Sequence, residues 1–247
     1  PARSASRQWL ALHLERVRLR DVYRHFFAFG TVALDRFLLI RDRVDGFDLH
    51  YQGRELLEAQ RATGQGAILL GSHLGSFEAM GAFARDHDLP VYVVMFTEHA
   101  RRISGMLEAA SPGAAARIVA IDPGDSSWVL RIKRLVDDGA FVALLGDRAA
   151  GGRQVAVDFF GRQAFVAAGP YEVASILRCP VFLCTGLFEQ PNRYRLLCEP
   201  FADRVELPRS GRDEALTGYA QRFADSLEGY ARAHPFCWFN FYDFWAE

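Results

Sequence analysis

The sequence predicts one α/β domain, with a mostly parallel central sheet that has an antiparallel edge and helices on both faces. Short apolar runs of strand length alternate along the chain with segments that have the spacing of amphipathic helices, as in βαβ units. Near the C-terminus two apolar runs are separated only by Gln190, Pro191 and Asn192, which indicates a hairpin. Half of the 247 residues are hydrophobic, so we expect a single domain over residues 1–247.

The first elements, over residues 1–45, are expected to form a basic, amphipathic helical segment that packs on the domain. Nine arginines occur from Arg3 to Arg43, among aromatic and aliphatic residues at helical spacing. One interpretation is a helix pair on a membrane surface, where arginines meet anionic head groups. The other is a charged, solvated face over a packed apolar face.

The elements of the sheet follow a short helix through Leu56 and Leu57. A polar, glycine-rich stretch is expected before the helix that begins at Pro170. Another helix is expected to begin after Asp125 or Ser126 and to stop at Gly139. The predicted strands cover 67–70, 91–95, 117–121, 140–145, 181–188 and 194–201. The helix at Pro170 is expected to cover 170–178, and three more helices are expected over 77–85, 99–109 and 212–233.

Composition argues against several classes of function. The formal net charge of -1 gives no overall attraction to nucleic acid. The four cysteines (Cys179, Cys184, Cys198 and Cys237) form no CxxC pair, so we expect buried thiols, with neither a disulfide framework nor a zinc site. No apolar run approaches the roughly 18 residues of a membrane span. Since the chain starts at Pro1, processing could have removed an upstream anchor.

The segment GSHLGSFE places a histidine between an apolar strand and a helix, where α/β folds position their sites. In one continuous helix, five positions would separate His73 and Glu78 by about 140°. The two side chains can therefore meet only if His73 precedes the helix. Gly71 and Gly75 give the backbone the freedom for such a turn, from which Glu78 is expected to reach back to the imidazole.

A histidine paired with a carboxylate in this way is a general base. The carboxylate fixes the imidazole tautomer and leaves the other ring nitrogen free to accept a hydroxyl proton. We therefore expect His73 and Glu78 to be catalytic. The backbone N–H groups of Gly75 and Ser76 are expected to stabilise a tetrahedral oxyanion.

The turn has other interpretations. The most serious is that His73 is a hydrogen-bonded turn residue and that Glu78 complements the helix dipole. A nucleophile elbow requires G-x-S-x-G, whereas Ser72 stands one place too early. H-x-x-x-x-E also lacks the spacing of a zinc motif, so we expect neither a metal nor a cofactor.

The segment AILLGSHLGSFE resembles the H-x4-D/E motif of the lysophospholipid acyltransferase superfamily, in particular the branch of the bacterial lipid A late acyltransferases. The resemblance covers roughly Gly53 to the end. That branch has an aspartate-centred motif after a strand, then Phe-Phe-Gly, a glycine and a helix. The corresponding residues here are Asp147 and Arg148, the segment 158–161, and Gly169. Arg148 stands where that branch often has Gln, which suggests a subgroup with a different acceptor.

This resemblance implies transfer of a fatty acyl group from an acyl carrier protein or coenzyme A thioester to a lipid, glycolipid or related amphiphilic acceptor. In this role His73 would deprotonate the acceptor and Glu78 would orient the imidazole, without an acyl-enzyme. The resemblance also implies a peripheral protein at the cytoplasmic face of the bacterial inner membrane.

Asp147 and Arg148 follow a predicted strand that ends near the expected site. Arg148, and more weakly Arg153, are therefore candidates to bind a carrier phosphate or an acidic acceptor group. The alternative is a structural ion network in a loop. Two other functions also stay open: a non-catalytic lipid-binding or carrier-binding protein of the same fold, and a hydrolase of acyl thioesters.

Overall fold

A seven-stranded sheet forms the centre of the computed structural model, which describes residues 1–41, 43–97, 117–122, 126–148 and 152–245. The strand order is β1-β9-β8-β2-β5-β3-β4. Five neighbouring strands, from β8 to β4, are parallel, whereas β9 is antiparallel to β8 and carries β1 parallel to itself. The predicted α/β class, with its antiparallel edge, is confirmed. The strands are β1 (Asp48–Gln52), β2 (Ile68–Gly71), β3 (Val91–Phe96), β4 (Ile118–Ile121), β5 (Phe141–Leu145), β8 (Val181–Gln190) and β9 (Arg193–Ala202).

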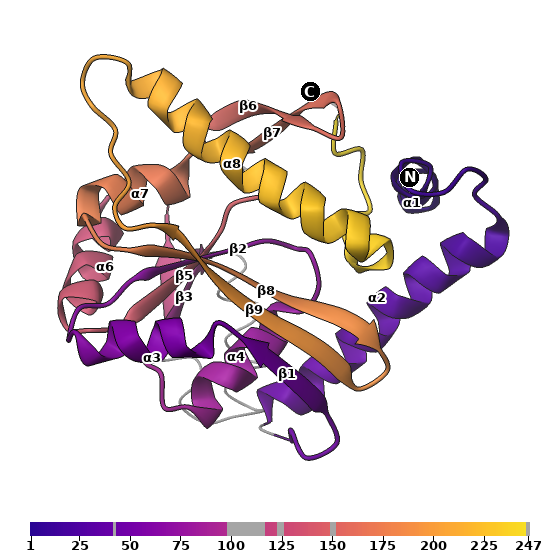
Figure 1. Cartoon of the computed structure of the whole chain (residues 1–247), viewed down its shortest axis with the longest axis horizontal. Helices are drawn as coiled ribbons and strands as arrows, with labels where there is room; N and C mark the ends of the chain where they lie inside the picture. The colour runs from indigo at the N-terminus through magenta and orange to yellow at the C-terminus, as the bar shows by residue number, and fades with distance from the viewer. Residues whose placement is uncertain (42, 98–116, 123–125, 149–151, 246–247) are drawn as a thin grey trace.

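Helices cover both faces of this sheet. In Figure 1, α7 and α8 lie above the strands and α3 and α4 lie below them. Every residue of β2 is buried, as expected for a strand covered on both faces. Helix α8 buries one face against the molecule, including Leu216, Phe223 and Leu227. These helices are α3 (Arg54–Ala62), α4 (Phe77–Asp86), α6 (Ser127–Asp137), α7 (Gly169–Leu177) and α8 (Arg212–Ala233).

The polar stretch expected before α7 is in fact a separate hairpin. Strands β6 (Gln154–Phe159) and β7 (Arg162–Ala167) pair antiparallel, and β6 alternates exposed and buried residues. Phe160 and Gly161 both have positive φ, as a two-residue hairpin turn of type I′ requires. The strand β1 was also missed. The helix predicted over 99–109 lies outside the described residues.

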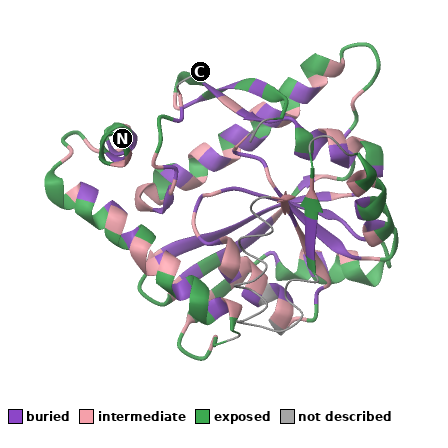
Figure 2. Ribbon diagram, turned by 180° about the vertical axis from the view of Figure 1, so that it is seen from behind, coloured by how far each residue is buried: buried purple, intermediate pink, exposed green. Residues whose placement is uncertain are grey.

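The N-terminal segment contains two helices, α1 (Ala2–Leu10) and α2 (Leu19–Ile40). They contact the C-terminal segment that follows α8, which begins with the 3-10 turn η2 (Pro235–Cys237). Trp9 donates its indole N–H to the carbonyl of Pro235 at 2.6 Å, and Nε2 of the buried His25 lies 2.6 Å from the carbonyl of Trp238. Figure 2 shows buried central strands and exposed residues along α2. Among the described helices, none is long and apolar enough to cross a membrane.

Candidate active site

His73 lies in a tight turn between β2 and α4, as predicted. Gly75 has φ of +81°, and a Cβ there would lie 2.0 Å from the carbonyl oxygen of Gly186. The backbone of the turn therefore passes β8 so closely that no side chain fits between them. Ser76 then starts the helix, because its hydroxyl accepts a hydrogen bond from the N–H of Ala79 at 3.2 Å.

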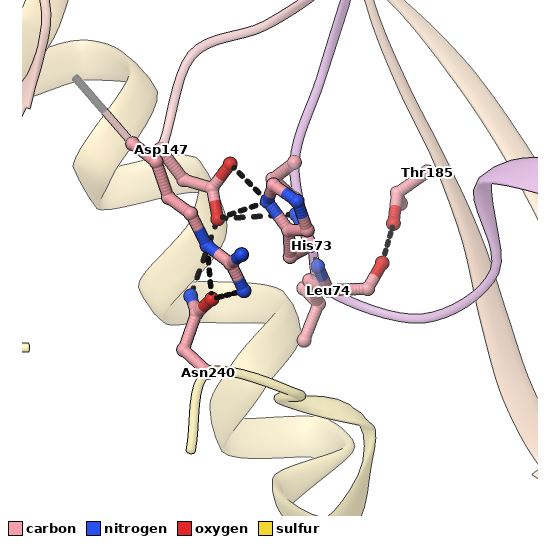
Figure 3. Close-up of polar contacts among 7 residues, drawn as sticks. His73, Leu74, Asp147, Thr185 and Asn240 are labelled. Atoms are coloured by element: carbon pink, nitrogen blue, oxygen red, sulfur yellow. Dashed lines mark hydrogen bonds and ion pairs between the residues drawn. The ribbon is translucent and has the colours of Figure 1, made fainter. Parts of the chain in front are cut away.

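The turn is fixed on both sides. On the β8 side, Thr185 donates its hydroxyl to the carbonyl of Leu74 at 3.0 Å (Figure 3). On the other side, Leu74 forms a β-bridge with Trp238, and the N–H of Phe239 donates to the carbonyl of His73 at 3.4 Å. The imidazole therefore projects from a backbone that two segments hold in place.

Two further backbone hydrogen bonds of the turn correct the expected oxyanion site. The N–H of Gly75 donates to the carbonyl of Cys237 at 2.8 Å, and that of Ser76 donates to the carbonyl of Gly186 at 2.6 Å. Both donors are used to join the turn to its neighbours, since buried backbone groups must be paired. Gly75 and Ser76 consequently shape the turn and offer no free N–H to a substrate.

Asp147 is the carboxylate that contacts the imidazole of His73. Nδ1 lies 3.0 Å from Oδ1 and 3.1 Å from Oδ2 of Asp147, and the His73 N–H donates to Oδ2 at 3.1 Å (Figure 3). The sheet explains the pairing. The parallel strands β2 and β5 align Gly71 with Leu145, so the residues two places further on lie side by side.

The two members of this pair differ in exposure. The Asp147 side chain is fully buried, whereas a third of the His73 side chain is exposed. Burial on its own raises the pKa of Asp147, but His73, with help from Arg148 and Asn240, lowers it below its usual value. An ionised Asp147 accepts a hydrogen bond from Nδ1–H of His73, and this tautomer leaves the lone pair on Nε2. Among the described residues, none hydrogen-bonds to Nε2.

The expected pairing of His73 with Glu78 is wrong. Glu78 lies in the first turn of α4 and forms an ion pair with Arg36 of α2. No hydrogen bond between the described residues joins Glu78 to His73. Once Ser76 starts the helix, the first turn directs Glu78 toward α2, while the imidazole lies at the strand end beside Asp147.

Arg148 and Asn240 extend the site beyond Asp147. The side-chain oxygen of Asn240 accepts hydrogen bonds from Nε of Arg148, at 2.6 Å, and from Nη2. The amide nitrogen of Asn240 donates to Oδ2 of Asp147 at 3.2 Å. Sequence reasoning missed Asn240. The one feature of the sequence that points to Asn240 is that it is a single amide within the dense aromatic segment 235–245.

Arg153 is placed away from this cluster. It forms ion pairs with Glu172 of α7 at 3.2 Å and with Asp213 of α8 at 2.7 Å. No contact between described residues joins it to His73 or Asp147. Arg153 therefore belongs to a surface ion-pair network, and its expected role in substrate binding stays a prediction.

The model of a family described as bacterial lipid A biosynthesis acyltransferase matches residues 16–246, almost the whole chain. Among curated proteins, none matches the chain.

Proposed function

The chain belongs to the bacterial lipid A biosynthesis acyltransferase family and is an acyltransferase of lipid biosynthesis; on this premise we propose that His73, oriented by Asp147, is its general base. The observation that carries the proposal is the pair of contacts from Nδ1 to a fully buried carboxylate, with Nε2 on the partly exposed side chain left to accept a proton. Geometry of this kind is what general-base catalysis requires.

In the proposed reaction an acceptor hydroxyl or amine attacks the carbonyl carbon of an acyl thioester. As the new bond forms, Nε2 of His73 takes the proton of the nucleophile, and Asp147 stabilises the imidazolium. The tetrahedral intermediate then expels the thiolate, which receives that proton from His73. The acyl group passes directly to the acceptor, and the donor leaves as the free thiol of acyl carrier protein or coenzyme A.

We further propose that Arg148 binds an anionic group of the donor or the acceptor. Among the described residues, no carboxylate forms a direct ion pair with it, and its guanidinium lies 5.4 Å from the ring centre of Tyr242. Asn240 holds it through a neutral carbonyl, so much of its charge is available to a ligand. A carrier phosphate or an acidic group of the acceptor would suit this position.

The outer face of α2 supports a peripheral position on a membrane. Seven large apolar residues of this helix are exposed. At about 100° per residue, six of them lie within one sector of about 100°, and Phe29 lies outside it. Arg20 and Arg24 lie along one edge of the sector and suit anionic head groups. We propose that this face, called the α2 apolar face, docks on the cytoplasmic leaflet of the inner membrane. It consists of Leu19, Tyr23, Phe27, Leu34, Phe37 and Leu38.

The test is incubation of a total lipid extract with acylated acyl carrier protein or acyl-coenzyme A whose acyl group is radiolabelled, with labelled products identified by mass spectrometry. We expect labelled lipid from the unchanged protein, and a rate about 10²- to 10⁴-fold lower for His73→Ala. The matched control is His50→Ala, on the edge strand β1. A folded His73→Ala protein that keeps its full rate would contradict the proposal. Release of free fatty acid without an acceptor would instead favour a hydrolase.

A further inference from the structure

We propose that Asn240 is a positioning residue, which links Arg148 to Asp147 and thereby fixes the tautomer of His73. The inference rests on the proposed function of His73 as general base. It concerns a residue 93 positions from Asp147 along the chain, on the C-terminal segment that follows η2.

The amide of Asn240 has one permitted orientation. Its oxygen accepts from two nitrogens of Arg148, and its nitrogen donates to the carboxylate of Asp147. If the amide were reversed, N–H groups would face the guanidinium and a carbonyl would face the carboxylate. Both contacts would then be repulsive, so the cation on one side and the anion on the other fix the amide.

The fixed amide in turn fixes the carboxylate. Oδ2 of Asp147 accepts from Asn240 at 3.2 Å and from the backbone N–H of His73 at 3.1 Å. Both oxygens are thereby held against Nδ1 of His73, Oδ1 at 3.0 Å and Oδ2 at 3.1 Å. A carboxylate that is fully buried needs such donors to remain ionised, and only an ionised Asp147 keeps the imidazole proton on Nδ1.

Asn240 is also held in place independently of Arg148. It is only 3% exposed, and its neighbours on the C-terminal segment contact the turn that carries His73. Trp238 pairs with Leu74, and the N–H of Phe239 reaches the carbonyl of His73. The segment therefore contacts both the backbone of the histidine and, through Asn240, its carboxylate partner (Figure 3).

Two variants separate the parts of this link. Asn240→Asp is nearly isosteric and keeps an acceptor for Arg148, but it replaces the donor to Asp147 with an oxygen. Asn240→Leu removes both the donor and the acceptor at similar volume. The matched control is Asn192→Asp in the exposed β8–β9 turn, which makes the same chemical change far from the site.

The first readout is the tautomer of His73, observed by NMR on protein with ¹⁵N-labelled histidine. The His73 signals are those that disappear in His73→Gln. We expect Nδ1–H in the unchanged protein and in Asn192→Asp, and a mixture of tautomers in both Asn240 variants. This measurement needs no turnover, so it tests the link even if His73→Gln keeps its activity and the proposed function fails.

The second readout is kinetic. We expect kcat to fall about 10- to 100-fold in Asn240→Leu, with KM changed less than about threefold, and the acid limb of the pH profile of kcat/KM to move. A purely structural role would lower the amount of folded protein without moving that profile. If a folded Asn240→Asp or Asn240→Leu protein keeps the Nδ1–H tautomer and an unchanged pH profile, Asn240 does not position Asp147.

Discussion

The carboxylates on the two sides of the His73 turn differ in burial and in their partners. On the strand side, Asp147 is fully buried and receives hydrogen bonds from His73 and Asn240. On the helix side, Glu78 keeps 16% of its side chain exposed and pairs with Arg36 of α2. Glu78 is nearer to the histidine in sequence, yet Asp147 is its partner in space. The strand side of the turn thus holds the proposed chemistry, whereas the helix side connects the turn to α2.

The largest expected effect lies on the strand side. Asp147→Asn keeps the shape of the side chain, but its amide no longer requires a proton on Nδ1 of His73. We expect kcat to fall by about 10³- to 10⁴-fold with little change in KM, by analogy with the loss of a triad aspartate. Steady-state kinetics with saturating donor check this. A fall of less than tenfold in folded protein would remove Asp147 from the proposed mechanism.

The α2 apolar face gives the next largest effect. The double change Phe27→Asp and Leu34→Asp places charges on the proposed docking surface, and burying two such side chains contributes about 3 to 6 kcal/mol. We expect binding to vesicles with anionic lipid to weaken about 100-fold or more, as measured by co-sedimentation. Ile176→Asp, on the exposed side of α7, is the control. Unchanged binding would show that another surface docks.

A third prediction concerns pH and His25, which connects α2 to the C-terminal segment. Burial lowers the pKa of His25 to about 4. In the unfolded chain the imidazole of His25 has a pKa of about 6.5. Burial of the neutral imidazole therefore makes its full contribution to the free energy of unfolding above that pH, and this contribution is lost as the pH falls toward 4. His25→Gln cannot be protonated. From pH 7.5 to 5.0 we expect it to lose about 2 kcal/mol less stability than the unchanged protein, as measured by urea unfolding. Equal losses of stability in the two proteins would contradict the lowered pKa of His25.

The smallest effect is expected at Glu78. Its ion pair with the half-exposed Arg36 should contribute at most about 1 kcal/mol to the free energy of unfolding. Glu78→Gln should therefore lower kcat less than about tenfold, and Arg36→Gln should do the same. If Glu78→Gln is as damaging as Asp147→Asn, while Arg36→Gln is mild, Glu78 approaches the imidazole during turnover and the contrast between the two sides disappears.

Much of this arrangement could be predicted from local sequence. The apolar runs that became β2 and β5, and the glycines around His73, predicted both the sheet and the turn. The carboxylate partner could not be found in the same way, because β5 pairs with β2 only after the chain has passed through β3 and β4. Asn240 was harder still. Its contact with Asp147 depends on how a C-terminal segment without regular strands packs on the turn.

The turn that carries His73 crosses β8 with no side chain between the two backbones. A Cβ on Gly75 would meet the carbonyl of Gly186, and a Cβ on Gly186 would lie 2.4 Å from the carbonyl of Ser76. Main chain therefore rests directly on main chain, and no flexible side chain can absorb a displacement. A laboratory library that varies the acceptor preference should leave both glycines untouched, because even a single methyl group there would displace the turn that carries His73.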